Sequence, residues 1–124
     1  MTQTKAYAAQ KQAAPLDAFT LERRAVGSED VHIAIDYCGV CHSDLHMVNN
    51  DWGISRYPIV PGHEIIGHVM SVGENVQKFK PGDRVGVGCF VDSCRTCQAC
   101  QAQVEQYCLN GFKATYSSET KDPG

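Results

Sequence analysis

The residues best suited to chemistry are the cysteines in the last third of the chain. Four of them are spaced C-x2-C-x2-C-x7-C and occupy positions Cys94, Cys97, Cys100 and Cys108. Two-residue gaps let a tight turn direct neighbouring sulfurs at one point, and four thiolates bind Zn2+ tetrahedrally at about 2.3 Å. A site closed by four thiolates has no free coordination position. We therefore expect a structural zinc that does no chemistry itself.

Two other uses of these four cysteines stay open. Disulfides would need an oxidising compartment, but the chain has seven cysteines, an odd number, and its amino terminus has no apolar signal-like segment. An iron–sulfur cluster also begins with C-x2-C-x2-C, but a ferredoxin continues with x3-C-P. Here seven residues separate Cys100 from Cys108, and Leu109 rather than proline follows Cys108. The spacing favours zinc.

The composition is that of an ordinary folded domain. The chain has 124 residues, a net charge of −3 and 43% hydrophobic residues, which indicates one domain, residues 1–124, with the cysteine lobe at about 89–110. No basic face is visible, so a nucleic-acid partner is not expected. No apolar run reaches the roughly 20 residues that span a membrane. The expected location is the cytoplasm.

A second group of candidate ligands is dispersed along the chain. Cys41 follows an alternating segment, and His63 and Glu64 follow a Pro-Gly bend. Thiolate, imidazole and carboxylate are all zinc ligands, and fewer than four protein ligands leave room for water or a substrate oxygen. On spacing alone, the alternative that His63 is a turn histidine and Glu64 a surface carboxylate stays open.

Strands must position most of these groups. Residues 31–37 alternate at period two, with Val31, Ile33, Ile35 and Tyr37 facing one way, and form the clearest strand. Ser43 or Asp44 is suited to begin a short helix that ends near residue 49. Further strands are predicted at 65–72 and 85–91, the second leading into the cysteine lobe. Residues 80–83 form a type II turn, and residues 1–15 a short strand or an irregular arm.

Five ordered motifs carry a resemblance to a known family. They are Gly-Val-Cys-His-Ser-Asp at 39–44, Pro-Gly-His-Glu at 61–64, Val-Gly-Glu-Asn-Val at 72–76, Lys-Pro-Gly-Asp-Arg-Val at 80–85, and the four-cysteine lobe. Together they resemble the catalytic domain of the zinc-dependent medium-chain alcohol dehydrogenases, over roughly residues 5 to 120. Segments 37–46 and 86–94 are most similar to the cinnamyl-alcohol-dehydrogenase-like branch. The resemblance implies a mainly β fold: a GroES-like, partly open β-barrel with short helices and a four-cysteine zinc lobe.

The resemblance implies a catalytic zinc. Cys41 and His63 would be its ligands, and Glu64 would be a neighbouring carboxylate able to enter the coordination sphere. Asp44 would orient His63, because metal-bound histidines usually need such a partner on the other ring nitrogen.

The same resemblance implies roles around the substrate. Ser43 would hydrogen-bond the substrate oxygen, His46 would carry the proton to solvent, and His42 would lie near the cofactor phosphates. The substrate pocket would be lined by Trp52, Cys89 and Phe90. For Trp52, a core or lid aromatic is the other interpretation.

The implied reaction is hydride exchange between an alcohol or aldehyde and NADP(H). Zinc would polarise the substrate oxygen, and Ser43 and His46 would relay the proton. The implied partner is therefore a small alcohol or aldehyde, and the full-length form is expected to be a homodimer.

The chain departs from this family in length. The family continues into a Rossmann domain and supplies a further cysteine ligand to the catalytic zinc, whereas no Cys or His follows Cys108 here. Gly86 and Gly88 begin like a dinucleotide fingerprint, but residue 91 is valine. We therefore expect a fragment that is inactive alone. The competing hypotheses are a non-catalytic zinc module that binds a partner, and an iron–sulfur electron carrier.

Overall fold

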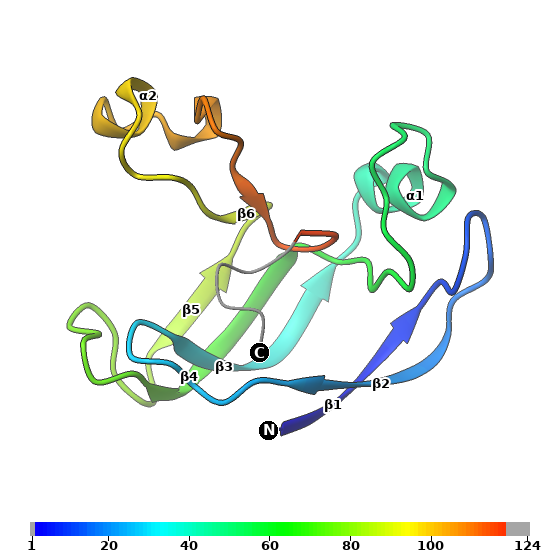
Figure 1. Cartoon of the computed structure of the whole chain (residues 1–124). Coiled ribbons are helices and arrows are strands. Elements are labelled where there is room, and N and C mark those ends of the chain that lie inside the picture. Colours follow the sequence, from blue (N-terminus) through cyan, green and yellow to red (C-terminus); the bar gives the residue numbers. More distant parts are fainter. Residues whose placement is uncertain (1, 119–124) are drawn as a thin grey trace.

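The computed structural model describes residues 2–118 and shows a mainly β chain (Figure 1). Strands β1 (Thr2–Ala8) and β2 (Asp17–Arg23) form an antiparallel pair, and β3 (Val31–Gly39), β4 (Glu64–Val72) and β5 (Arg84–Val87) form an antiparallel sheet in that order. Strands β6 (Phe90–Asp92) and β7 (Lys113–Ala114) form a third pair. The helices are α1 (His42–Asn49), α2 (Gln98–Gln101) and the 3-10 turn η1 (Glu105–Tyr107).

These three sheets do not close into a barrel within residues 2–118, which agrees with the expected partly open, mainly β fold. Figure 1 shows α1 beyond the end of β3 and the cysteine lobe, with α2, beyond the end of β5. In the described part of the chain, no helix is both long and apolar enough to cross a membrane.

Strands β3 and β4 confirm the two clearest strand predictions, but the strict alternation of β3 is interrupted. The pairing shifts between Ile35 and Tyr37, so that β3 carries an extra residue, Asp36, at a bulge. Ile35 is 57% exposed and Tyr37 is 75% exposed. The apolar residues predicted to share one face therefore do not form one continuous buried row.

Helix α1 begins two or three residues earlier than predicted. Its N-cap is Cys41, not Ser43 or Asp44. The reason is that Asp44 lies at the third helical position and its carboxylate accepts the backbone N–H of Cys41 at 2.8 Å. The side chain expected to cap the helix from outside thus stabilises its start from within the first turn.

The core that holds α1 in place is small. Ala9, Met47 and Ile59 are buried together, and the partly buried side chains that pack against them are Val48, Tyr57 and Tyr116. Ala9 and Ile59 exchange two backbone hydrogen bonds of 2.9 Å. The end of β1 is therefore joined to the loop that precedes β4, so the loop that carries His63 is anchored.

The predicted strand at 85–91 is wrong as a single element. It divides into β5 and β6 at Gly88 and Cys89, because β5 pairs with β4 whereas β6 pairs with β7 on the far side of the cysteine lobe. The turn before it is confirmed: Gly82 has a φ of 91°, and the N–H of Asp83 donates to the carbonyl of Lys80. The amino-terminal arm is the regular strand β1.

Candidate active site

The structure brings the four predicted lobe cysteines together. The Sγ atoms of Cys94, Cys97, Cys100 and Cys108 all lie within 4.8 Å of one another. The Sγ of Cys100 is 3.8 Å from that of Cys94 and 3.5 Å from that of Cys97. Two thiolates on a tetrahedral zinc with bonds of about 2.3 Å are separated by about 3.8 Å. The donor set and its spacing therefore fit zinc.

Backbone amides surround these sulfurs. The N–H of Cys97 donates to Cys94 Sγ at 3.3 Å, that of Cys94 to Cys108 Sγ at 3.5 Å, and that of Leu109 to Cys97 Sγ at 3.4 Å. Such donors favour the charged thiolate over the thiol. The turns set by the short cysteine spacing thus supply both the ligands and their hydrogen-bond donors.

The thiols of Cys94 and Cys100 differ in acidity. The side chain of Asn110 and the backbone N–H of Thr96 lower the pKa of Cys94 to about 5. The hydroxyl of Ser93 favours the thiolate of Cys100, but burial and the neighbouring thiol of Cys97 outweigh it and raise the pKa of Cys100 to about 11. A dication among them would make all four thiolates, since metal ligation deprotonates a thiol.

The second candidate site joins the ends of β3 and β4. Cys41 Sγ lies 3.3 Å from His63 Nε2, and Cys41, Asp44 and His63 offer three donor atoms within 4.8 Å of one another. A sulfur and a nitrogen bound to one tetrahedral zinc are separated by about 3.6 Å. The pair therefore fits zinc as well, and the predicted ligands Cys41 and His63 lie side by side.

Asp44 is the buried charge of this site, with 3% of its surface exposed. One of its oxygens accepts the N–H of Cys41 and the other accepts the N–H of Gly62, both at 2.8 Å. Its Oδ1 is also 3.3 Å from His63 Nδ1, close enough for an ion pair but not in the direction of a hydrogen bond. Asp44 thus holds the backbone on both sides of the Cys41–His63 pair.

Glu64 lies outside this three-residue group. It is exposed at the first position of β4, opposite Gly39, and a Cβ added to Gly39 would lie 2.5 Å from its Oε2. Its carboxylate is therefore folded over Gly39 at the end of β3. Although Glu64 follows His63 in the sequence, its oxygens are not among the donor atoms that meet at the site.

The predicted relay residues lie on α1. His46 Nδ1 is 2.7 Å from Asp51 Oδ2, and the ring of His46 lies between those of His42 and Trp52, with centroids at 4.9 Å and 5.0 Å. Ser43 is half-buried on the same helix, whereas Trp52 is 51% exposed. The ring of His46 therefore contacts two tilted neighbours, His42 and Trp52, and His42 directly follows Cys41 in the sequence.

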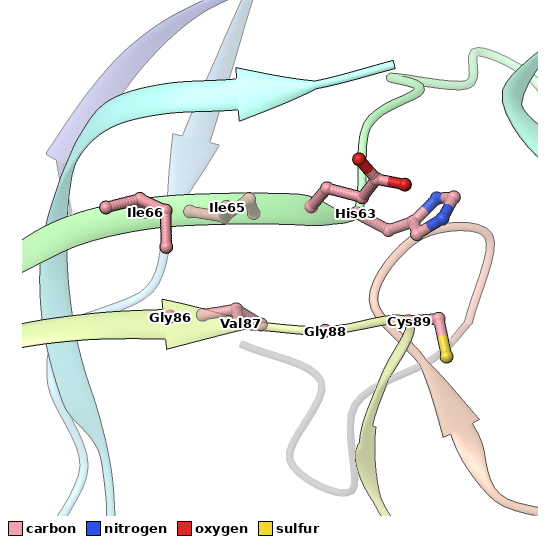
Figure 2. A pocket seen from close by; sticks show the side chains of 8 residues that line it. His63, Ile65, Ile66, Gly86, Val87, Gly88 and Cys89 are labelled. Carbon is pink, nitrogen blue, oxygen red and sulfur yellow. The ribbon is translucent and has the colours of Figure 1, made fainter. Parts of the chain in front are cut away.

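An open groove runs from the site along β4 and β5. Its lining residues are His63, Glu64, Ile65, Ile66, Gly86, Val87, Gly88 and Cys89. Figure 2 shows the imidazole of His63 and the thiol of Cys89 at the same end of this groove. Phe90 is not in the lining: it packs on Phe112, with ring centroids 5.6 Å apart. Of the predicted pocket residues, Cys89 lines the groove.

Two residues near the site were not predicted from the sequence. Asp51 holds His46, and Tyr116 contacts His63 with ring centroids 5.2 Å apart. Burial and the charges of Asp44, Cys41 and Cys89 raise the pKa of Tyr116 to about 12. The five-residue separation of His46 and Asp51 carried a weak signal. Tyr116 carried none, because only the return of the chain from the cysteine lobe brings it to His63.

Residues 27–121 match the family described as the alcohol dehydrogenase GroES-like domain. The chain belongs to this family. It is 53% identical over 123 residues to the NADP-dependent alcohol dehydrogenase C 1 of Mycolicibacterium smegmatis, covering 98% of this chain and 35% of that protein. It is also 53% identical to cinnamyl alcohol dehydrogenase 2 of Rauvolfia serpentina, covering 94% of this chain and 32% of that one.

Solved structures show the same likeness. A cinnamyl alcohol dehydrogenase from Sorghum bicolor and one from Helicobacter pylori complexed with NADP(H) each have a TM-score of 0.89 and 44% identity to this GroES-like chain. Each comparison covers 94% of this chain and 33% of the solved one. The chain therefore spans about a third of the length of the relatives it matches. The predicted family and its cinnamyl-alcohol-dehydrogenase-like branch are confirmed.

Proposed function

We propose that residues 1–124 form the amino-terminal part of the catalytic domain of a zinc-dependent, NADP(H)-linked alcohol dehydrogenase or aldehyde reductase. The observation that carries this proposal is the placement of Cys41 Sγ 3.3 Å from His63 Nε2, where His63 lines a groove that continues along Ile65, Ile66 and Val87. Its support is the 53% identity to an NADP-dependent alcohol dehydrogenase.

In this proposal Cys41 and His63 hold the catalytic zinc, which when bound acts as a Lewis acid on the substrate oxygen. Asp44 does not ligate it. Both carboxylate oxygens accept backbone amides, and Asp44 faces Nδ1 of His63 while Cys41 faces Nε2. Asp44 therefore positions the two ligands. Glu64 directly follows His63, so its carboxylate would reach the site after a side-chain rotation.

The proton path uses Ser43 and His46. Ser43 donates to and accepts from the substrate oxygen, and His46 exchanges that proton with solvent. Asp51 lies 2.7 Å from His46 Nδ1 and therefore favours the tautomer that carries the proton there. Nε2 is then free to accept a proton. His42, exposed at the start of the same helix, would face the cofactor phosphates.

The test is a chimaera in which residues 1–124 replace the corresponding third of the Mycolicibacterium smegmatis relative. Ser43→Ala and His46→Ala are each expected to lower aldehyde-dependent NADPH oxidation by about 10²- to 10⁴-fold. Neither residue is a ligand, so zinc content by elemental analysis should not change.

His32→Ala removes an exposed histidine of β3 and is the matched control, expected to leave turnover unchanged. Loss of zinc in the Ser43 or His46 variant would contradict their assignment as relay residues. A folded chimaera that holds two zinc ions without turnover would instead favour the non-catalytic zinc module.

A further inference from the structure

The orientation of the His63 ring is not fixed by its polar contacts alone. His63 is 7% exposed, and its Nδ1 is buried without a hydrogen bond of good geometry. Cys41 Sγ and Asp44 Oδ1 each lie 3.3 Å from one of the two ring nitrogens. These two contacts determine which way the two nitrogens point. Because Nδ1 makes no directional hydrogen bond, they do not fix the tilt of the imidazole plane.

Tyr116 supplies the missing contact. Its ring meets that of His63 edge to face, with centroids 5.2 Å apart and an angle of 63° between the planes. Such pairs contribute about 0.5–1.5 kcal/mol beyond the area they bury. Tyr116 also packs against the buried cluster of Ala9, Met47 and Ile59. The phenol ring therefore connects the imidazole to the core.

The segment around Tyr116 is attached on both sides. Before it, the N–H of Thr115 donates to the carbonyl of Cys89 at 3.2 Å, and the Thr115 hydroxyl donates to the carbonyl of Gly88. After it, the Ser117 hydroxyl accepts the N–H of Arg56 at 2.8 Å. The segment thus spans from the end of β5 to the loop before β4, and Tyr116 lies at its centre.

We propose that Tyr116 is a positioning residue for His63, and that the segment returning from the cysteine lobe, residues 113–118, sets the tilt of the imidazole. The cysteine lobe then contributes to the ligand geometry through this segment. The inference rests on the proposed function only where it takes His63 to be a metal ligand; the packing of the two rings is independent of it.

The test compares three forms of the full chain: the natural one, Tyr116→Phe and Tyr116→Leu. The first measurement is NMR of the His63 ring signals without metal at Cys41 and His63. The ring current of residue 116 is expected to displace these signals in the natural chain and in Tyr116→Phe, and the displacement should vanish in Tyr116→Leu. Tyr7→Leu, at an exposed position of strand β1, is the control and should leave the His63 signals unchanged.

The second measurement is Co2+ affinity at Cys41 and His63, read from the thiolate-to-cobalt absorption with zinc kept in the cysteine lobe. Tyr116→Leu is expected to weaken Co2+ binding by about tenfold or more, and Tyr116→Phe to restore it. Unchanged His63 signals in Tyr116→Leu would overturn the proposal. So would a loss in Tyr116→Phe equal to that in Tyr116→Leu, since the hydroxyl rather than the ring would then matter.

A third variant covers the case in which Tyr116→Leu does not fold. Thr115→Val removes the hydroxyl that donates to Gly88 but keeps Tyr116. It is expected to shift the His63 signals and to weaken Co2+ binding by less than Tyr116→Leu would; unchanged signals would overturn the proposal. If the 124-residue chain alone binds Co2+ too weakly to measure, the same variants are compared in the chimaera with the Mycolicibacterium smegmatis relative. Absence of Co2+ binding at Cys41 and His63 in that chimaera would count against the proposed function, while the NMR comparison would still decide whether Tyr116 orients His63.

Discussion

Asp44 is the residue whose loss should damage the candidate site most. It is 3% exposed and accepts the amides of Cys41 and Gly62. Removing it leaves both donors unsatisfied, at about 1–3 kcal/mol each. Asp44→Ala should therefore lower the free energy of unfolding by about 2–6 kcal/mol in a urea titration.

Asp17→Ala, at an exposed position of β2, is the control for this prediction and should change the free energy of unfolding by no more than about 0.5 kcal/mol. Equal effects of the two substitutions would show that the Asp44 carboxylate does not hold the two loops together.

At the residue scale, the sequence predicts what depends on neighbours along the chain. The four lobe cysteines follow from spacing alone, and Cys41 and His63 follow from motifs that resemble a known family. Tyr116 could not be predicted in this way. Its contact with His63 depends on the return of residues 113–118 to the ends of β4 and β5, which no local pattern encodes.

At the scale of elements, β4 approaches β3 so closely that Gly67 has no room for a side chain. A Cβ there would lie 2.2 Å from the carbonyl oxygen of Ala34 in β3. Because that neighbour is backbone, the strands would have to separate. Gly67→Ala should therefore destabilise the chain by about 1–3 kcal/mol, measured as a lower urea midpoint.

Gly88→Ala is the matched control for this strand contact, because a Cβ at Gly88 meets nothing within 4 Å and its φ is not positive. It should leave the urea midpoint nearly unchanged. A midpoint for Gly67→Ala equal to that of Gly88→Ala would mean that β3 and β4 adjust without cost.

The cysteine lobe is expected to fold only with metal. The buried side chains of the lobe are two of its candidate zinc ligands, Cys100 and Cys108, and the polar Ser93. Tyr107 and Leu109 are 70% and 74% exposed. With so little apolar burial, metal binding supplies most of the folding energy. A strong chelator, or Cys108→Ser, should abolish amide exchange protection at 93–112 and leave that of β1 and β2. Protection that survives chelation would contradict this.

A strand was predictable from the sequence where its whole length pairs with the same neighbour, as β3 does with β4. The strand predicted at 85–91 was wrong because its two halves pair with different strands, β4 and β7, which lie on opposite sides of it in the sequence. The apolar alternation continues through Gly88 and Cys89, but the pairing does not. The period of the hydrophobic pattern indicates a local preference for strand, but it does not indicate which strand is available for pairing.

At the scale of the whole molecule, the 124-residue chain is expected to hold one zinc tightly in the cysteine lobe and a second weakly or not at all. The cysteine set is complete within residues 2–118, whereas Cys41 and His63 are a pair supported by Asp44. After mild chelation, elemental analysis should give close to one zinc per chain.

The same chain is expected to show no NADPH oxidation above background with aldehydes. It spans about a third of its relatives, and its groove is open to water, which weakens the electrostatics on which Lewis-acid chemistry depends. Steady aldehyde-dependent oxidation by the purified 124-residue chain would contradict this expectation.

Gly39 and Glu64 form the last residue pair of the β3–β4 ladder. His63 directly precedes Glu64, and Cys41 lies two residues after Gly39. Each time this end of the ladder frays, the thiolate and the imidazole move apart. A metal bound to both residues, as proposed above, would favour the closed strand end by mass action, and fraying of that end would help to release it. The lifetime of such a metal would therefore depend on the local opening of these two strand ends as well as on the strength of its bonds to sulfur and nitrogen.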